Sequence, residues 1–157
     1  MTIGGISANY WYIHVSAYGT GNLHCVQEIY PVLSNGYCKI IRRKHVGEWG
    51  FSEIENPPME IGVEYRTTER YKGEPVYVTV VDCLTFVAGT EVTWTEETVS
   101  KIVRAEANIA DIIPMTIGYL YGDVRQGVFV YGNKIEMLGE APGYINNLYV
   151  TIYYTKS

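Results

Sequence analysis

The 157-residue sequence is poor in positive charge and lacks any long run of apolar residues. Twelve lysines and arginines against seventeen acidic residues give a formal net charge of −5 at pH 7, so the broad cationic surface of a duplex-binding protein is missing. No run reaches the roughly 18 apolar residues of a membrane span, and the N-terminus lacks the basic region of a signal peptide. We therefore expect a soluble protein that is not exported by a cleaved signal, binds no nucleic acid and does not insert into a membrane.

Cysteine and histidine are also scarce, with three of each. They lie far apart: Cys25, Cys38, Cys83, His14, His24 and His45. An odd number of cysteines without a C-x-x-C pair predicts neither a disulfide framework nor a zinc cage, and the histidines have no metal-ligand spacing. His24 and Cys25 are adjacent, but neighbours in a strand point to opposite faces and could not share a proton. The sequence therefore predicts no metal site.

Motifs of enzymes are missing as well. No G-x-S-x-G elbow, glycine-rich phosphate loop or dinucleotide fingerprint occurs. Glu96 and Glu97 could be imagined as the two carboxylates of a glycosidase, but adjacent residues rarely converge on one bond, and such pairs stand roughly 5 to 10 Å apart. We therefore expect no enzyme and no cofactor.

What the sequence does contain is alternation of period two. The alternating segments are 10–15, 25–31, 37–43, 63–71, 75–82, 128–131, 134–138 and 148–155. Turn chemistry lies between several of them, at Gly19–Gly21, Ser34–Gly36, Lys72–Gly73, Gly132–Asn133 and Ala141–Gly143. Short strands at this spacing predict an all-β protein. The segment 98–110 fits either a helix or a strand, and we favour the strand.

Two consecutive prolines, Pro57 and Pro58, give the clearest boundary. Prolines supply no amide donors and hold the preceding residue extended, so no sheet should continue through them. We expect an N-terminal module over residues 1–58, followed by a hairpin at 63–82 and a C-terminal β lobe, together 59–157.

The hairpin has a predicted register. If Lys72 and Gly73 form a two-residue loop, Tyr71 lies opposite Glu74. One mostly apolar face then pairs Glu69 with Val76, Thr67 with Val78 and Tyr65 with Val80. The other face pairs Glu64 with Val81, Arg66 with Thr79, Thr68 with Tyr77 and Arg70 with Pro75. Its charges have no opposite-sign partner directly across the ribbon, so they need partners elsewhere or water.

A larger assembly would supply those partners, because a two-stranded ribbon and small lobes are only marginally stable alone. In a symmetric homo-oligomer the valine face could pack on another copy while the arginines met its carboxylates or carbonyls. The interface residues expected on this basis are Glu64, Arg66, Glu69, Arg70, Val76, Val78 and Val80. The alternative is an outer face with solvated arginines, where each pair contributes about 0 to 1 kcal/mol.

The run from Gly47 to Cys83, which contains "ENPPMEIGVEYRTTERYKGEPVYVTV", resembles a segment near the C-termini of many phage tail fibre and receptor-binding proteins. There a tryptophan precedes a Pro-Pro step and an EYRTTERY-type hairpin. The ending "YVTIYYTKS" resembles the closing strand of their head domains, and residues 8–54 resemble the preceding knob module. Residues 84–127 match no pattern of the family. The resemblance implies a knob-like β module, a hairpin shoulder, a C-terminal antiparallel β-sandwich head and a homotrimer.

The same resemblance implies attachment of a phage or prophage virion to a saccharide on the bacterial cell surface. The protein would then be made in the bacterial cytoplasm, belong to the virion tail, and contact other tail proteins through a preceding N-terminal part. Two alternatives stay open: a polysaccharide-degrading tail protein and a purely structural fibre segment.

Sugar binding needs aromatic faces together with a few polar groups, and the chain has fifteen tyrosines against three phenylalanines. The expected ligand-binding residues are Trp94, Tyr119, Tyr121, Asp123, Tyr131, Tyr144 and Asn146. Each has a plainer interpretation. Trp94 shares a strand face with Val92 and would then be buried in a core or interface, and the tyrosines would serve packing, since tyrosine suits strands.

Overall fold

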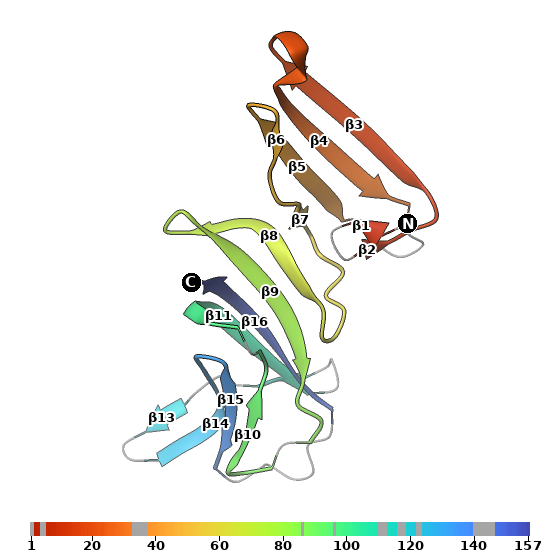
Figure 1. The fold of residues 1–157 in the computed structure, drawn as a ribbon. Helices are drawn as coiled ribbons and strands as arrows, with labels where there is room; N and C mark the ends of the chain where they lie inside the picture. Colours follow the sequence, from red (N-terminus) through yellow and green to blue (C-terminus); the bar gives the residue numbers. More distant parts are fainter. Residues whose placement is uncertain are drawn as a thin grey trace.

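The computed structural model is all-β, and its described residues form strands and one short 3-10 turn but no α-helix (Figure 1). None of these residues belongs to a helix that could cross a membrane. The residues that the structure describes are 2–3, 6–32, 38–85, 87–95, 97–109, 113–115, 119–121, 124–139 and 147–157.

The N-terminal half forms one antiparallel sheet, whose strands run in the order β3, β4, β5 and β7. Its strands are β3 (Trp11–Tyr18), β4 (His24–Pro31), β5 (Lys39–His45), β6 (Glu48–Trp49) and β7 (Glu53–Glu55), with β6 paired to β5. A small ribbon of β1 (Thr2–Ile3) and β2 (Ile6–Ser7) lies beside them. Strand β3 is the edge of this sheet, and seven of its eight side chains are exposed.

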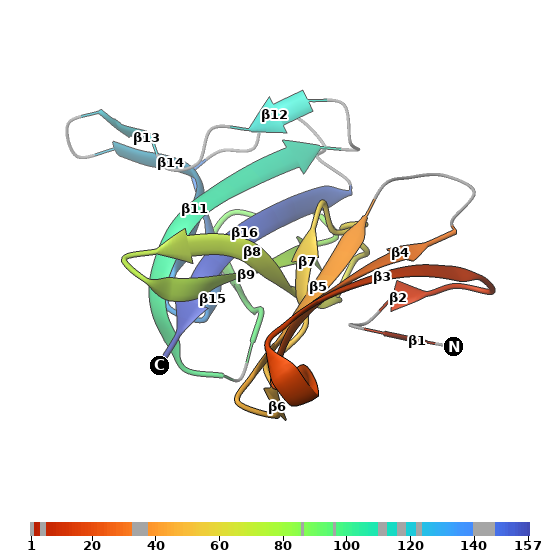
Figure 2. The same ribbon diagram turned by 90° about the horizontal axis from the view of Figure 1, so that it is seen from above.

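The C-terminal half contains two sheets (Figures 1 and 2). The first has the order β8, β9, β16, β11 and β12, namely Glu64–Tyr71, Glu74–Asp82, Leu148–Lys156, Val99–Ile109 and Ile113–Met115. The second has the order β10, β15, β14 and β13, namely Thr90–Thr93, Lys134–Leu138, Val124–Tyr131 and Tyr119–Tyr121. One parallel pairing, Ile54 with Thr67, joins β7 to β8 and makes the N-terminal sheet continuous with the first of these.

Two apolar cores hold this arrangement. The first lies between the two C-terminal sheets, because it combines side chains of β11 and β16 with Val128, Ile135 and Met137 of the four-stranded sheet. The second lies where the halves join, and its buried members include Ile40 and Ile54 from one half with Tyr65 and Val78 from the other. The contact between the halves is therefore apolar at its centre.

Most predicted strands are confirmed. Each of the eight alternating segments overlaps an observed strand, and the segment 98–110 is a strand, β11, as favoured. Strand β7 ends two residues before Pro57, as the proline pair predicts. Lys72 and Gly73 form the expected tight turn with φ of 51° and 89°, which is the pair of positive values that a type I′ hairpin turn requires. The turn expected at Gly132–Asn133 is present too, whereas those at Ser34–Gly36 and Ala141–Gly143 fall outside the fully described residues.

The predicted hairpin register is right at the turn and wrong beyond it. Tyr71 pairs with Glu74 and Arg70 with Pro75, but a register shift follows between Arg66 and Arg70. Beyond the shift the pairs are Arg66 with Tyr77, Tyr65 with Val78 and Glu64 with Thr79. Two extra residues of β8 are therefore accommodated in a bulge, and a shift of two keeps each side chain on its expected face.

The charges of the ribbon have partners inside the chain, which corrects the reason for expecting a second copy there. Glu64 accepts hydrogen bonds from Tyr154 and from Lys156, the latter at 2.7 Å. Glu69 binds Arg104, and Arg66 and Arg70 both pair with Glu53. The three interface valines are already covered, since Val76, Val78 and Val80 are 1%, 0% and 8% exposed. A neighbouring copy is not needed to bury them, and they have little surface left to offer one.

Glu53 is the centre of the charged cluster at the join. Its side chain is 6% exposed, and its carboxylate contacts Arg43 of β5 at 2.8 Å, Arg66 of β8 at 3.5 Å and Arg70 of β8. Burial alone would raise the pKa of this carboxyl, but the hydrogen bonds from Arg70 and Arg43 outweigh it and the pKa is lowered. The carboxylate is therefore ionised at neutral pH and links the two halves.

We expect Glu53→Gln to lower the free energy of unfolding by about 2 kcal/mol at pH 7, because three arginines lose their shared negative charge. Urea denaturation would measure this, with Glu48→Gln as a control that removes the same charge from an exposed position. A group with a lowered folded pKa stabilises above its unfolded pKa, and that contribution is lost as the pH falls through the folded value. The gap between wild type and Glu53→Gln should therefore shrink below about pH 4; a gap that is independent of pH would contradict the ionised carboxylate.

Candidate ligand-binding site

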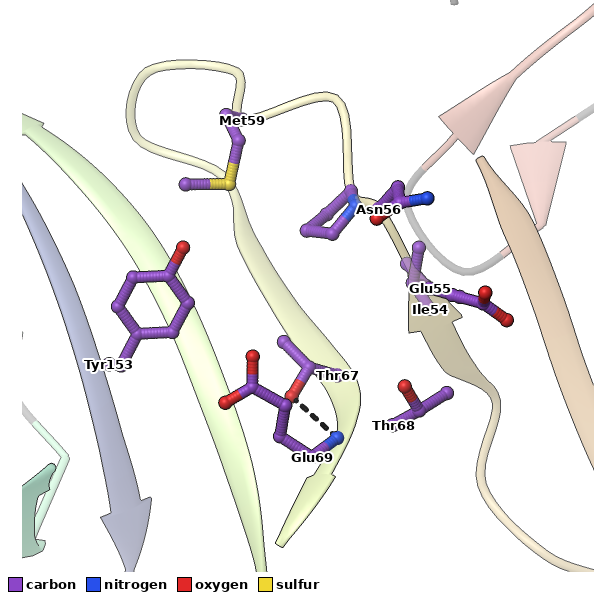
Figure 3. A pocket seen from close by; sticks show the side chains of 9 residues that line it. Ile54, Glu55, Asn56, Met59, Thr67, Thr68, Glu69 and Tyr153 are labelled. Carbon is purple, nitrogen blue, oxygen red and sulfur yellow. Dashed lines mark hydrogen bonds between the residues drawn. The ribbon is translucent and has the colours of Figure 1, made fainter. Parts of the chain in front are cut away.

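A pocket of about 350 Å³ lies beside the join, between the loop that follows β7, the bulged part of β8, and β16 (Figure 3). It is lined by Ile54, Glu55, Asn56, Pro57, Met59, Thr67, Thr68, Glu69 and Tyr153. Figure 3 shows Tyr153 on one side of it, Asn56 on the opposite side, Met59 above and Glu69 below.

The loop over the pocket has an unusual backbone. Asn56 and Met59 flank the two prolines and have φ of 53° and 58°. Asparagine tolerates this left-handed region, whereas a side chain such as that of methionine adopts it only at a cost. Two backbone hydrogen bonds further along, from Gly62 N to Val80 O at 2.8 Å and from Val63 N to Glu60 O at 3.2 Å, hold the loop. Strained positions of this kind persist when the surroundings fix them, and they cluster at ligand sites.

The bulge in β8 forms the floor of the pocket. Thr67 is 4% exposed, and its hydroxyl donates to the carbonyl of Val76 at 2.8 Å and accepts from the amide of Glu69 at 3.1 Å. These bonds satisfy main-chain groups where the strand register shifts, between Arg66 and Arg70. The bulge therefore keeps Thr67, Thr68 and Glu69 together in the pocket wall.

Arg104 of β11 fixes two residues of the pocket although it does not line it. Its guanidinium donates to both carboxylate oxygens of Glu69, at 2.7 and 2.8 Å, and lies 3.5 Å from the ring centre of Tyr153. Hydrogen bonds from Arg104 lower the pKa of Glu69, and the same pairing raises the pKa of Arg104. Both side chains are about two-fifths exposed or more, so the pair adds little stability. Its effect is to orient an ionised carboxylate beside an aromatic ring.

These groups suit a polyhydroxylated ligand. Tyr153, Met59 and Pro57 offer apolar surface, while the carboxylate of Glu69 and the hydroxyl of Thr68 offer hydrogen bonds. A cleft that combines an aromatic side chain with a few oriented polar groups is typical of small-molecule sites. Within the described ranges, no cluster of three or more histidine, cysteine or acidic side chains is placed to hold a metal ion.

None of the residues predicted to bind ligand lines this pocket, and the two whose side chains are described, Trp94 and Tyr131, lie at or in the four-stranded sheet. Trp94 packs on the core between the sheets, edge-on to Tyr154 with ring centres 4.7 Å apart, and its indole nitrogen is buried. This placement matches the plainer interpretation of Trp94 as a packing residue. Tyr131 is 46% exposed and donates to Glu91 at 2.8 Å. Since Trp94 faces the core and Tyr131 faces outward, the structure does not bring these two together.

The remaining predicted ligand residues are described in part or not at all. Tyr119 and Tyr121 lie in β13, which pairs with β14, and their side chains fall outside the description. Asp123, Tyr144 and Asn146 lie outside the described residues. For all seven residues the role in binding stays a prediction.

Sequence reasoning missed the pocket itself. The proline pair and the ribbon charges both contribute to it, but from the sequence alone the prolines predict a boundary and the charges an interface. Tyr153 gave no signal of its own, because it is one of several tyrosines in a strand that alternates regularly.

Comparisons with protein-family models, with curated proteins and with solved structures found no match for this chain.

We expect Thr67→Val to lower the free energy of unfolding by about 1 to 2 kcal/mol, because the carbonyl of Val76 and the amide of Glu69 lose a buried partner. Thr67→Ser keeps the hydroxyl and should recover at least half of the loss. Urea denaturation of the three proteins would measure this. Equal losses for valine and serine would mean that the methyl group, and not the hydroxyl, supports the bulge.

Proposed function

We propose that this chain is the receptor-binding region of a phage or prophage tail fibre and that it attaches the virion to a saccharide on the host cell surface. The pocket beside β8 is the observation that carries the proposal. All of its lining residues except Tyr153 belong to the segment Gly47 to Cys83, which resembles a segment of tail fibre and receptor-binding proteins. A pocket with one aromatic side chain, two carboxylates and hydroxyls suits a sugar.

The finer architecture proposed is a knob-like module, a hairpin shoulder and a β-sandwich head. The shared core of β11, β16 and the four-stranded sheet supports the head, because two sheets that bury one face each against the other form such a layer pair. The hairpin β8–β9 would then be the shoulder, since it contributes Tyr65 and Val78 to the core at the join.

We propose a homotrimer in this role, since three weak sugar sites on one tip raise avidity far beyond one contact. Support comes from the edge strand β3, in which Tyr12, Ile13 and Val15 are 63%, 49% and 51% exposed. Its eight residues carry no lysine, arginine, aspartate, glutamate or proline, the devices that usually protect a free edge. An uncovered edge of this kind is suited to contact with another copy.

Binding without cleavage fits the pocket better than hydrolysis. A glycosidase needs one carboxyl with a raised pKa to protonate the leaving oxygen. Glu69 has a lowered pKa because Arg104 holds its charge, which is the opposite of what a general acid requires. We therefore propose an adhesin and not an enzyme.

Attachment can be tested with the purified, fluorescently labelled chain and a panel of bacterial strains. We expect saturable binding to some strains, competed by their extracted surface polysaccharide, and a loss of at least about tenfold for Tyr153→Ala, as expected when an aromatic contact is removed. Tyr149→Ala is the matched control, since it lies on the same face of β16 outside the pocket. Failure of the chain to bind any strain would reject the proposed function.

Assembly can be tested by light scattering. We expect a mass three times the 17.7 kDa of one chain, and we expect Val15→Lys to shift the population toward monomer because it places a charge on the uncovered edge. Val87→Lys is the control, because Val87 is equally exposed, at 51%, and lies outside β3. A monomer at every concentration up to about 1 mM would contradict the trimer, since that concentration corresponds to only ~4 kcal/mol of association free energy.

A further inference from the structure

The pocket beside β8 has a marked charge pattern. Among the described residues that line it, two are glutamates, Glu55 and Glu69, and none is lysine, arginine or histidine. Both glutamates are ion-paired from outside the pocket: Lys39 lies 2.6 Å from Glu55, and Arg104 binds Glu69 through two hydrogen bonds. The positive charges near the pocket are therefore already engaged with protein carboxylates.

From this pattern we infer that the pocket selects an uncharged pyranose over acidic sugars. The inference rests on the proposed function and gives the ligand class of the same site. An acidic sugar, with a carboxylate or phosphate group, would bring its charge toward Glu69 and find no cation in the described wall to receive it. Desolvation of an unpaired anion is costly, so the charged ligand should bind more weakly than its neutral counterpart.

The hydrogen-bonding groups also fit hydroxyls. Each oxygen of the Glu69 carboxylate accepts one bond from Arg104, and a carboxylate oxygen can accept about two, so each has capacity for a ligand hydroxyl. Asn56 offers a donor and an acceptor, and Thr68 a hydroxyl, from the opposite wall and the floor. An ammonium group would gain less from Glu69 than from a free carboxylate, because Arg104 already neutralises the charge. The neutral ring is therefore favoured over an amino sugar as well.

The apolar side of the ring has a defined place. Arg104 covers one face of Tyr153 at 3.5 Å from the ring centre, so a ligand can contact only the other face or the edge. Figure 3 shows the hydroxyl of Tyr153 directed toward Met59, with Glu69 on the opposite side. A pyranose between these groups would place its C–H surface near Tyr153 and Met59 and its hydroxyls near Glu69.

Arg104 is then a positioning residue of the site. It touches Glu69 and Tyr153 but does not line the pocket. Lysine at this position would keep the positive charge, but it would lose the two-point hydrogen bonding and the flat contact with the ring. The carboxylate would then rotate freely, which weakens binding of every sugar without changing the preference for neutral ones.

The test uses the complete chain and matched methyl glycosides, observed by chemical-shift titration in ¹H–¹⁵N spectra. Methyl glucoside, methyl glucuronide and methyl glucosaminide differ in charge but share one ring. We expect the glucuronide to bind about tenfold more weakly than the glucoside. Glu69→Gln should bring the two within about twofold, because it keeps the shape and leaves the positive charge of Arg104 without its carboxylate partner, free to attract the carboxylate of the glucuronide. Glu60→Gln, an exposed change in the same loop but outside the pocket lining, should leave the ratio unchanged.

Arg104→Lys should weaken the glucoside and the glucuronide alike, by about fivefold, with the ratio preserved. The amide spectrum of each variant reports whether it is folded. Equal or tighter binding of the glucuronide or the glucosaminide would overturn the inference. Unchanged chemical-shift perturbations by the glucoside in all three variants, Glu69→Gln, Tyr153→Ala and Arg104→Lys, would also overturn the inference. The sugar would then bind elsewhere on the chain, and the proposed attachment to cells would not be affected. If the chain binds cells but binds none of the three glycosides, the inference would also be overturned, and a protein receptor would be indicated.

Discussion

The contact between the carboxylate of Glu53 and three arginines is the constraint on which the rest of the structure depends. Apart from contacts of the arginines, the described residues join the two halves through one parallel pairing, Ile54 with Thr67, and a small apolar core. Neither would fix the angle between the halves, because a single pairing allows rotation about itself. The buried Glu53 carboxylate is bound by one arginine of β5 and two of β8, and these three contacts restrain rotation between the halves. The charges also cannot separate cheaply, since parting them would leave a buried carboxylate unpaired.

The pocket is a consequence of the same arrangement. Arg66 and Arg70 reach Glu53 from positions on either side of the bulge in β8. With both arginines anchored, the three residues between them bulge away from the ladder, and the Thr67 hydroxyl satisfies the main-chain groups that lose their partners. The bulge then faces the loop that contains Pro57 and Pro58 and follows β7. A structural ion cluster and a ligand-sized hollow are therefore two results of one local geometry.

The sequence predicted the strands well but gave no sign of the pocket beside β8, for a physical reason. Alternation and turn chemistry are local, so the Lys72–Gly73 turn and the segments around it could be assigned from neighbouring residues alone. The bulge could not, because it depends on Glu53, which is 17 residues from Arg70 in the chain. The position of Trp94 likewise depends on contacts between residues that are distant in the sequence. Its residue type suggests a sugar contact, and only the position of Tyr154 shows that its ring is occupied by packing.

The pairing of the ribbon charges within the chain removes one reason for association between copies. A second copy is not required to satisfy Arg66, Arg70 or the valines, so the hairpin no longer supplies a thermodynamic need for association. Among the described residues, β3 is an edge strand with apolar side chains exposed on both of its faces. If copies associate, the force should therefore come from the N-terminal sheet, with the pocket beside β8 left open. An assembly held in this way would carry several identical pockets, and that is what multivalent attachment requires.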